Sequence, residues 1–353
     1  MDLFTHVLLG AKVAHATAPD RARLTLRERM LLGGIAAAFP DSDFIGFLIN
    51  PLIFLADWHQ GPTHSVVLLP LWAALIGVAF AALAKRKSAF FEATLVSGLG
   101  LASHIASDLL TVYGTMVLYP LSPWRPSLGT TFVIDPCFTA IVLLGLALGV
   151  RTGRRWVAGV GLAVLCGYVA VQAGLQQRAL EIGRASAHAR GFPIEQLSAL
   201  PQPFSPFNWK LIGSNEEVHY EAYLNLAGHA PLLPPVPGLQ QFHDMAAAFR
   251  PPAQLSWQAR HRYGDQPEMR VLIEHLWEDP RFAPFRRFAV YPSLSAVESD
   301  ISEICVWFTD LRYDLPVLPD TFRYGFCRTS GEKSWQLYRL RYFSERARQR
   351  ILP

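Results

Sequence analysis

Residues 65–84 read SVVLLPLWAALIGVAFAALA and contain no charged side chain. A helix of about 20 apolar residues crosses the roughly 30 Å hydrocarbon core of a bilayer, so this stretch predicts a membrane-spanning helix. The residues just before it (57–64) read DWHQGPTH, with His59 and His64 on either side of a Gly-Pro turn. Such histidines either satisfy their ring nitrogens with hydrogen bonds or bind a metal. The rest of the chain decides between these readings.

The composition is that of a membrane protein. Of the 353 residues, 51% are hydrophobic and only 17% are charged, and the mean hydropathy is +0.21. The apolar residues concentrate before residue 180, whereas Pro, Arg and aromatic residues fill the remainder. The formal net charge is +4 without a dense basic stripe, which argues against a nucleic-acid partner. The lipid bilayer is the expected surrounding of the first half.

Further apolar stretches predict additional membrane segments. Residues 89–113, 134–150 and 156–175 are expected to span the bilayer, and residues 2–18 are read as a retained helix because Lys12 interrupts the apolar run. Residues 30–39 are too short to span alone and residues 44–56 are broken by Pro51, so both are expected to be re-entrant, interfacial or packed against neighbours.

Basic residues mark the cytoplasmic ends of membrane segments. They form three clusters, at 21–29, 85–87 and 151–155. If all three clusters are cytoplasmic, the opposite ends of the segments gather potential metal ligands on the extracytoplasmic face. These ligands are His6, Asp41, Asp43, His59, His64, His104, Asp108 and Asp135. The last span then carries the second half of the chain to the same face.

The second half alternates polar and apolar residues in runs such as HYEAYLNL and ICVWFTDLRYDL, which is typical of antiparallel strands. The expected fold class is therefore an α-helical membrane bundle (1–180) followed by an extracytoplasmic α+β soluble domain with an antiparallel sheet (181–353). Cys305 and Cys327 fall on predicted strands of this domain. They can pair if it faces an oxidising compartment, and the sequence leaves the pairing open.

His104 and Asp108 are spaced i, i+4, so they share one face of a helix. The pair can grip a metal ion, or the carboxylate can orient the imidazole; the plainer alternative is a hydrogen-bonded polar pair within the bundle. We favour a metal site, because ionisable groups inside membranes are costly and tend to be functional. Taken alone, His6 would be an ordinary core histidine and Asp135 an N-cap.

The full set offers nitrogen and oxygen donors without cysteine, which suits zinc, with manganese or iron as alternatives. The donors suffice for one or two divalent ions, and two ions favour phosphoester hydrolysis. A water bound to the metal is the expected nucleophile, with Asp43 as general base. Arg125, in the loop 113–132, is expected to contact a phosphate or to be a solvated arginine.

Several ordered motifs within residues 1–150 resemble the YdjM-like family of membrane-bound metal-dependent hydrolases. They are the start from Asp2 to Gly10, the Pro-Asp-Ser-Asp segment at 40–43, the block HQGPTHS at 59–65, the pair His104 and Asp108, and the later Asp-Pro at 135–136. The resemblance implies metal-dependent hydrolysis and carries its metal-type residues over to the eight positions above. Gln60 departs from the family pattern, in which an arginine is common.

The sequence thus predicts an integral protein of a bacterial-type cytoplasmic membrane that hydrolyses a lipid-linked or amphiphilic ester, most plausibly a phosphoester. A non-enzymatic metal-binding protein, acting as a sensor, transporter or scaffold, is the alternative. The polar residues gather at one end of the segments rather than at the midplane, which favours the enzyme over a transporter.

Overall fold

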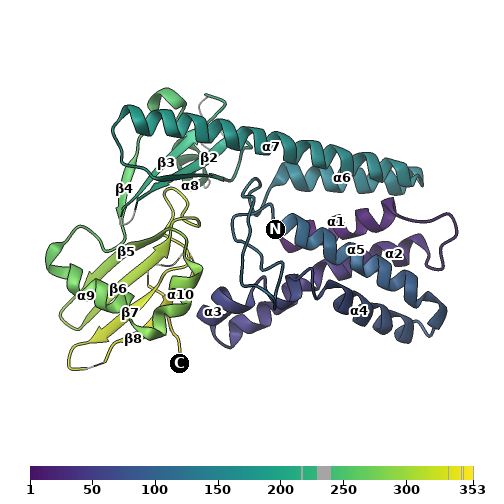
Figure 1. The fold of residues 1–353 in the computed structure, drawn as a ribbon, viewed down its shortest axis with the longest axis horizontal. Coiled ribbons are helices and arrows are strands. Elements are labelled where there is room, and N and C mark those ends of the chain that lie inside the picture. Colours follow the sequence, from purple (N-terminus) through teal and green to yellow (C-terminus); the bar gives the residue numbers. More distant parts are fainter. Residues whose placement is uncertain (216–217, 229–239, 333, 343, 345, 353) are drawn as a thin grey trace. The chain divides into compact units, whose positions relative to one another are not determined.

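The computed structural model describes the whole chain except residues 216–217, 229–239, 333, 343, 345 and 353. The chain divides into two compact units. The first contains Met1–Gly46 and Trp58–Gly174, and the second contains Phe47–Asp57 and Leu175–Pro353. The first unit is helical and the second contains two antiparallel sheets (Figure 1), which confirms the predicted fold class.

The first unit is a bundle of apolar helices joined by short irregular segments. Its α-helices are α1 (Leu3–Ala16), α2 (Leu26–Ala38), α4 (Leu69–Leu83), α5 (Phe90–Asp108), α6 (Pro136–Thr152) and the first part of α7 (Arg155–Ala189). The connecting elements are the nine-residue 3-10 helix η1 (Pro40–Leu48) and the single turns η3 (Pro62–His64) and η4 (Lys87–Ala89). Between η1 and η3, the short helices α3 (Pro51–Ile53) and η2 (Phe54–Trp58) follow one another.

Among the described residues, three helices are long and apolar enough to cross a membrane, at Leu26–Leu48, Lys87–Asp108 and Arg155–Ala189. The first of these differs from the prediction, because α2 and η1 together reach a length that residues 30–39 alone do not. The run 65–84 also differs. Its helix α4 has only 15 residues, and it reaches spanning length only with the preceding segment, from which it is bent by 68°.

The late start of α4 has a local cause. The hydroxyl of Ser65 accepts hydrogen bonds from the backbone N–H groups of Val67 and Leu68, at 3.1 and 3.3 Å. This turn consumes the first residues of the apolar run, and Pro70 then occupies a first-turn position of the helix, where it needs no N–H partner. Hydropathy alone does not distinguish such a turn from a helix.

The second unit has two antiparallel sheets. The first, in the order β1-β2-β3-β4, comprises β1 (Gln196–Pro201), β2 (Asn208–Ser214), β3 (Val218–Asn225) and β4 (Gln258–His261). The second, in the order β5 to β9, comprises β5 (Pro292–Ser299), β6 (Glu303–Asp310), β7 (Tyr324–Thr329), β8 (Gln336–Leu340) and β9 (Arg348–Arg350). Its helices are α8 (Gln240–Ala247), α9 (Pro267–Trp277) and α10 (Ala283–Phe288), with the turns η5 (Pro252–Gln254) and η6 (Pro280–Phe282).

Helices α9 and α10 lie beside the second sheet (Figure 1). They contact it through aromatic side chains. The ring of Trp277 lies 5.2 Å from that of Phe308 on β6, and Phe285 lies 5.7 Å from Tyr324 on β7. Phe282, between the two helices, contacts Phe326 on β7 at 5.4 Å. Such tilted ring pairs add to the stability gained from burying the rings.

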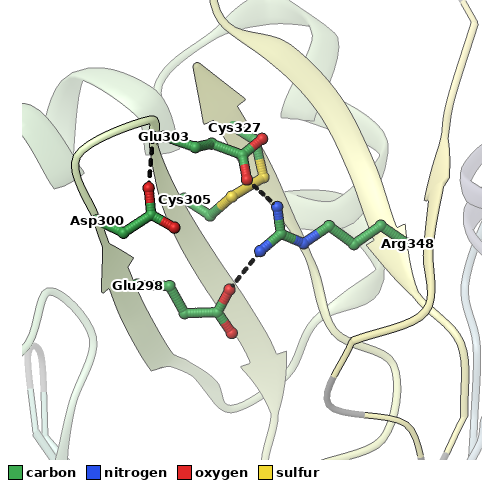
Figure 2. Close-up of a disulfide and its surroundings, with 6 residues drawn as sticks. All are labelled: Glu298, Asp300, Glu303, Cys305, Cys327 and Arg348. Carbon is green, nitrogen blue, oxygen red and sulfur yellow. Dashed lines mark hydrogen bonds and ion pairs between the residues drawn. A yellow bond between two sulfur atoms is a disulfide. The ribbon is translucent and has the colours of Figure 1, made fainter. Parts of the chain in front are cut away.

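A disulfide joins β6 and β7, two neighbouring inner strands of the second sheet. Cys305 on β6 and Cys327 on β7 are opposite one another in the strand register and form the bond (Figure 2). Both residues are buried. Beside the disulfide, Arg348 pairs with Glu298 and Glu303. The pairing that the sequence left open is therefore present.

The segment Phe47–Asp57 belongs to the second unit, although it lies early in the chain. The amide of Asn50 donates to the carbonyl of Leu352 at 3.2 Å, and Asp57 pairs with Arg287 at 2.8 Å. The guanidinium of Arg339 lies 4.4 Å from the centre of the Phe47 ring. The expected division at residue 180 did not anticipate this exchange.

Candidate metal centre

Two histidines meet where α1, α2 and α5 cross at glycines. A Cβ on Gly33 of α2 would lie 2.6 Å from the carbonyl oxygen of Gly10 on α1, and a Cβ on Gly100 of α5 would lie 2.6 Å from that of Gly33. Only residues without a side chain allow backbones this close. His6 precedes Gly10 by one turn and His104 follows Gly100 by one turn, and their rings stack 3.7 Å apart.

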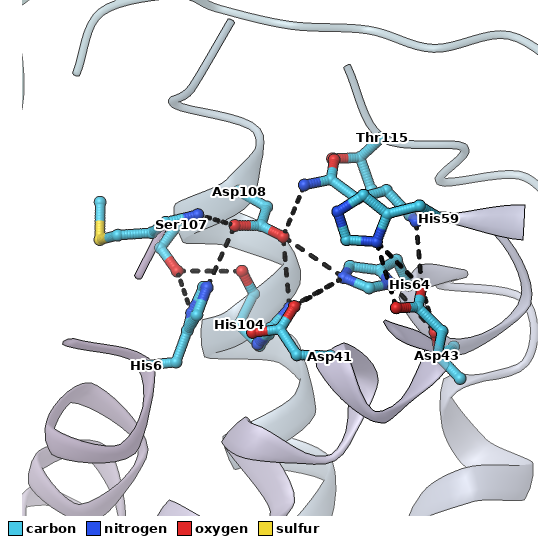
Figure 3. Close-up of polar contacts among 12 residues, drawn as sticks. His6, Asp41, Asp43, His59, His64, His104, Ser107, Asp108 and Thr115 are labelled. Carbon is cyan, nitrogen blue, oxygen red and sulfur yellow. Dashed lines mark hydrogen bonds and ion pairs between the residues drawn. The ribbon is translucent and has the colours of Figure 1, made fainter. Parts of the chain in front are cut away.

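Four side chains converge on one point beside these rings. They are Asp41, His64, His104 and Asp108, each with one donor atom within 4.8 Å of all the others (Figure 3). The Nε2 atoms of His64 and His104 are 3.0 Å apart. Asp108 Oδ2 lies 3.4 and 3.2 Å from these two nitrogens, and Asp41 Oδ1 lies 3.7 Å from each. The helix α5, the turn η3 and the 3-10 helix η1 supply these groups.

Hydrogen bonds at the far side of the rings set their orientation. His104 Nδ1 lies 2.6 Å from the carbonyl oxygen of Ala37, which only accepts, so the proton of a neutral His104 is on Nδ1. Its Nε2 lone pair therefore points at Nε2 of His64. His64 Nδ1 lies 3.0 Å from the hydroxyl of Thr63. A carbonyl or hydroxyl partner at the other nitrogen is the usual arrangement around a metal-bound imidazole.

His6 presents a buried nitrogen without a hydrogen bond. The single proton of the Ser107 hydroxyl is shared between the carbonyls of Ser103 and His104, each 2.9 Å away, so its oxygen accepts from His6 Nδ1 at 3.1 Å. The lone pair is then on Nε2 of His6. This atom makes no hydrogen bond among the described residues, although it lies 3.1 Å from Asp108 Oδ1. An imidazole lone pair facing a carboxylate is repulsive unless a cation stands beside them, and the amino group of Met1 pairs with the same Oδ1.

Asp43 and His59 form a pair next to the four-residue group. Asp43 Oδ1 lies 3.1 Å from His59 Nδ1, and its Oδ2 accepts from the backbone N–H of Gln60 at 3.2 Å. Oδ2 also lies 3.7 Å from Nδ1 of His64, on the side of the ring away from Asp108. His59 exposes 20% of its side chain, whereas His64 exposes none. Asp43 therefore contacts both histidines and lies outside the four-residue group.

Asp108 is held by groups that the sequence did not single out as its partners. The amide of Gln60 donates to Asp108 Oδ2 at 3.0 Å, and the Thr115 hydroxyl donates to the amide oxygen of Gln60 at 2.8 Å. The amino group of Met1 pairs with Asp108 Oδ1. Gln60 was noted only because it departs from the family pattern. The signal available in the sequence was an amide side chain directly after His59 and next to the Gly-Pro turn.

The donor set fits a divalent cation. It combines imidazole nitrogens and carboxylate oxygens without thiolate, as zinc, manganese and iron accept. Two imidazole nitrogens that share one ion at about 2.1 Å lie roughly 3.0–3.4 Å apart, and the His64 and His104 nitrogens are 3.0 Å apart. The unpartnered nitrogen of His6 supplies a further donor. The residues therefore match a possible metal-binding site.

Comparison with known proteins identifies the first half. Residues 1–179 match the model of the YdjM inner membrane protein family, which is more than half of the chain. The chain belongs to the YdjM family. No curated protein and no solved structure matches the chain. The family assignment and the apolar helices make the protein an integral protein of the cytoplasmic membrane.

Of the eight positions at which the YdjM resemblance implies metal-type residues, four form the central group and three lie beside it. The exception is Asp135. Its Oδ1 accepts from the backbone N–H of Phe138, which caps α6, and its Oδ2 accepts from the Tyr168 hydroxyl at 2.7 Å. Both oxygens are therefore engaged away from the central group, and the structure does not bring Asp135 into it. The N-cap reading describes its position.

Arg125 lies beside the Asp43–His59 pair. Its guanidinium donates to the carbonyls of His59 and Gly114, at 3.2 and 3.3 Å, and lies 5.9 Å from the ring centre of Tyr113. The structure thus places Arg125 next to the backbone of a site histidine. These contacts leave its expected contact with a phosphate as a prediction.

Proposed function

We propose that this YdjM family member is a metal-dependent hydrolase that cleaves a lipid-linked or amphiphilic ester, most plausibly a phosphoester. The observation that carries the proposal is the convergence of Asp41, His64, His104 and Asp108 on one point, beside a buried His6 nitrogen that has no hydrogen bond. Such a cluster of ionisable groups is costly inside a membrane protein and has a functional purpose in most cases.

In this proposal His6, His64, His104, Asp41 and Asp108 hold one or two divalent ions, with zinc as the first choice and manganese or iron as alternatives. A divalent ion supplies Lewis acidity and a water of lowered pKa. The surrounding chain keeps the ligands in place. The outer ring nitrogen contacts Ala37 in His104, Thr63 in His64 and Ser107 in His6. The amide of Gln60 binds the carboxylate of Asp108.

The Asp43–His59 pair provides the proton transfer. Asp43 binds Nδ1 of His59, which directs the other ring nitrogen away from the carboxylate. His59 is also the partly exposed histidine of the site, so a substrate can reach it. This assignment refines the expectation that Asp43 acts as the base: Asp43 orients and His59 exchanges the proton. Arg125, which bonds the His59 carbonyl, is placed to contact a phosphate.

Exposed apolar side chains on the element that carries the two aspartates support an amphiphilic substrate. Asp41 and Asp43 lie on η1, where Phe44, Ile45 and Leu48 expose 54%, 72% and 80% of their surfaces. In a membrane these side chains face lipid. An acyl chain that remains in the bilayer can therefore lie along η1 while its polar head reaches the central group.

We further propose that the site and the second unit face the extracytoplasmic side. The basic clusters lie in the connections from α1 to α2, from α4 to α5 and from α6 to α7. The ligands lie at the other ends of these helices, so the positive-inside rule puts them outside. The Cys305–Cys327 disulfide supports the same direction, because disulfides persist in oxidising compartments.

The test uses the full chain in lipid nanodiscs, with elemental analysis of bound metal and an assay of phosphoester turnover. We expect His64→Ala and Asp108→Ala to lose both stoichiometric metal and turnover, because each removes a central donor. The matched control is Asp135→Asn, which retains an N-cap side chain and leaves the central group intact. Turnover by the wild type that persists after complete removal of metal would contradict the proposal.

One observation favours a second candidate, a non-enzymatic metal site. His64, His104 and Asp108 are almost completely buried, and closed four-donor sites are typical of structural metals. This candidate predicts stoichiometric metal without turnover of esters, phosphoesters or amides. Asp41, which exposes 25% of its side chain, marks the side from which a substrate would have to enter.

A further inference from the structure

The second unit contains a polar cavity of about 390 Å³ that is unrelated to the metal centre. It lies between β3 and β4 of the first sheet and the loop 314–320 that joins β6 to β7 of the second. Glu221 and Arg260 line it from the first sheet, and Asp314 and Asp320 line it from the loop. Small-molecule sites are commonly of this size and bring a few polar groups together.

One carboxylate in the cavity wall has an oxygen without a hydrogen bond. Asp314 is 4% exposed, and its Oδ1 accepts from the Thr309 hydroxyl at 2.9 Å. Its Oδ2 accepts no hydrogen bond among the described residues, and Arg260 Nη2 lies 4.0 Å from it. An unsatisfied buried carboxylate oxygen is expensive, so a donor from outside the chain would be bound strongly here.

Two cations, Lys210 and Arg260, lie within 4.0 Å of the three carboxylates of the cavity. Lys210 pairs with Glu221 at 2.9 Å and donates its other protons to backbone carbonyls, so it is fully engaged. Arg260 then faces Glu221, Asp314 and Asp320 at 3.7, 4.0 and 3.5 Å, beyond ordinary hydrogen-bond distance. Three acidic groups thus share two cations, which leaves room for one more positive group once Asp314 is ionised.

The opposite charge is available at another point of the cavity wall. Arg250 lines the cavity but is exposed to solvent, and its side chain forms no ion pair among the described residues. A guanidinium in this situation is suited to a carboxylate or phosphate on a ligand. The cavity therefore has a buried acidic region and an exposed basic region.

We propose that this cavity binds a small zwitterion, with its ammonium group between Asp314 and Asp320 and its anionic group at Arg250. The ammonium supplies the hydrogen-bond donor that Asp314 Oδ2 lacks and the missing positive charge. The ligand is either a free solute or the headgroup of a lipid, since both can present an ammonium next to a phosphate. The binding does not depend on the metal centre or on hydrolysis.

Calorimetric titration of the full chain in phosphatidylglycerol nanodiscs with phosphoethanolamine tests the proposal. We expect saturable binding, with weaker binding of ethanolamine, which lacks the anion, and of inorganic phosphate, which lacks the ammonium. Adding phosphatidylethanolamine to the nanodisc separates the two sources. Competition with the free probe indicates a lipid headgroup, and its absence indicates a free solute.

Three variants assign the residues. We expect Asp314→Asn to weaken binding of phosphoethanolamine by at least about tenfold, as the loss of a charge-assisted hydrogen bond does. Arg250→Met should weaken the binding of phosphoethanolamine but leave the binding of ethanolamine unchanged. Asp300→Asn, the same exchange at an exposed turn of the same unit, is the matched control and should bind as the wild type does.

The number of protons released on ligand binding provides a further measurement. It would not differ between the wild type and Asp314→Asn if Asp314 had only a structural role. Burial, followed by the nearby Asp320, raises the pKa of Asp314 to about 8. The charged or titratable groups that face it are Lys210, Glu221, Tyr223, Arg260 and Asp320. At pH 7 an incoming ammonium should ionise Asp314, so the wild type should release up to about one proton more per ligand than Asp314→Asn.

Three results would overturn the proposal. They are no binding of phosphoethanolamine up to about 10 mM, far weaker than a specific site requires, an unchanged Kd in Asp314→Asn, or inorganic phosphate binding as tightly as phosphoethanolamine. Hydrogen exchange in β6 and β7 establishes that each variant is folded. Asp320→Asn, at a partly exposed position, provides a second test of the ammonium position if Asp314→Asn fails to fold.

Discussion

At the scale of single residues, the candidate metal centre depends on what each histidine contacts at its far side. The outer nitrogen of His104 is bound by a helix carbonyl at 2.6 Å, and that of His6 lies 3.1 Å from a serine hydroxyl. These contacts direct the remaining lone pairs towards Asp108. The polar contacts around the ligands therefore determine whether the histidines can bind an ion, as much as the histidines themselves do.

Gln60 provides the first prediction at this scale. Gln60→Ala removes the amide that donates to Asp108 and leaves the Thr115 hydroxyl without its acceptor. We expect metal affinity to fall by about 10- to 100-fold, as is usual when a group that supports a ligand is lost. Competition with a chelator of known affinity measures the change. Gln60→Glu, which retains an acceptor for Thr115 but not the donor to Asp108, separates the two contacts.

Asp314 provides a pH-dependent prediction. Its pKa rises from the ordinary 3.8 to about 8 because it is buried. Between these values the folded chain holds a proton that the unfolded chain releases, so this contribution to stability is complete below about pH 4 and is lost as the pH rises towards 8. Hydrogen exchange in β6 should therefore speed up as the pH rises from 5 to 8, after correction for the intrinsic exchange rate.

Asp314→Asn removes this dependence, since the amide does not titrate. The stability of the variant relative to the wild type should accordingly increase between pH 5 and pH 8. Equal pH dependence in the two proteins would show that Asp314 titrates normally.

The residues of the site were largely predictable from the sequence, but their roles were not. Histidines and carboxylates at the same end of apolar segments indicated Asp41, His64, His104 and Asp108 together. The sequence did not separate these from Asp43 and His59, because the Gly-Pro turn at 61–62 determines which side chains point inward. Asp135 was included by its depth, whereas in the structure its two oxygens accept from the Phe138 N–H and the Tyr168 hydroxyl.

At the scale of helices and strands, the glycine crossing is the feature on which the site depends. Gly33→Ala places a methyl group 2.6 Å from the carbonyl oxygen of Gly10 and forces α1 away from α2. We expect a loss of about 1–3 kcal/mol in stability, as overpacking usually causes, and weaker metal binding because His6 moves with α1. Thermal unfolding and metal content measure both effects.

The matched control is Gly159→Ala on α7, where nothing lies within 4 Å of the added methyl group. This exchange should leave metal content unchanged and slightly favour the helix, since alanine is the better helix former. Equal stability and equal metal content in Gly33→Ala and Gly159→Ala would show that α1 and α2 are not in close contact at Gly33.

Element boundaries were less predictable than element types. Hydropathy indicated the apolar helices, but α7 has 35 residues where 156–175 was expected, and its last part packs on the first sheet through Ala179. Arg29 was counted with the basic cluster 21–29, yet it is buried against Glu92 and the end of α1. Tertiary partners of this kind leave no periodic signal in the sequence.

At the scale of the whole molecule, the cysteines report on the compartment. Cys305 and Cys327 form a disulfide that closes a loop over a sequence separation of 22 residues, whereas Cys137 and Cys166 are free. Without reductant, alkylation of the denatured protein followed by mass spectrometry should modify only Cys137 and Cys166. Replacing both paired cysteines with serine should cost the second unit about 2–4 kcal/mol.

The same compartment is tested in cells with alkaline phosphatase, which requires disulfides, fused after residue 353. We expect an active fusion. A fusion within the basic segment 85–87 should be inactive and serves as the control. Unpaired Cys305 and Cys327 together with an inactive C-terminal fusion would place the second unit, and the proposed face of the metal centre, in the cytoplasm.

Because the early segment Phe47–Asp57 belongs to the second unit, the chain passes from the first unit to the second and back before it enters the second unit again. The chain leaves the first unit three residues after Asp43 and re-enters it one residue before His59. Truncation after residue 179 would strip Asn50, Asp57 and Phe47 of Leu352, Arg287 and Arg339. Without these contacts the segment Phe47–Asp57 would no longer be held at its place, and Asp43 and His59 on either side of it would be positioned less firmly. We expect a chain shortened in this way to keep its metal and to lose proton exchange. A fragment that represents the second unit should therefore contain residues 47–57 joined to residues 175–353, because a single cut separates the two parts.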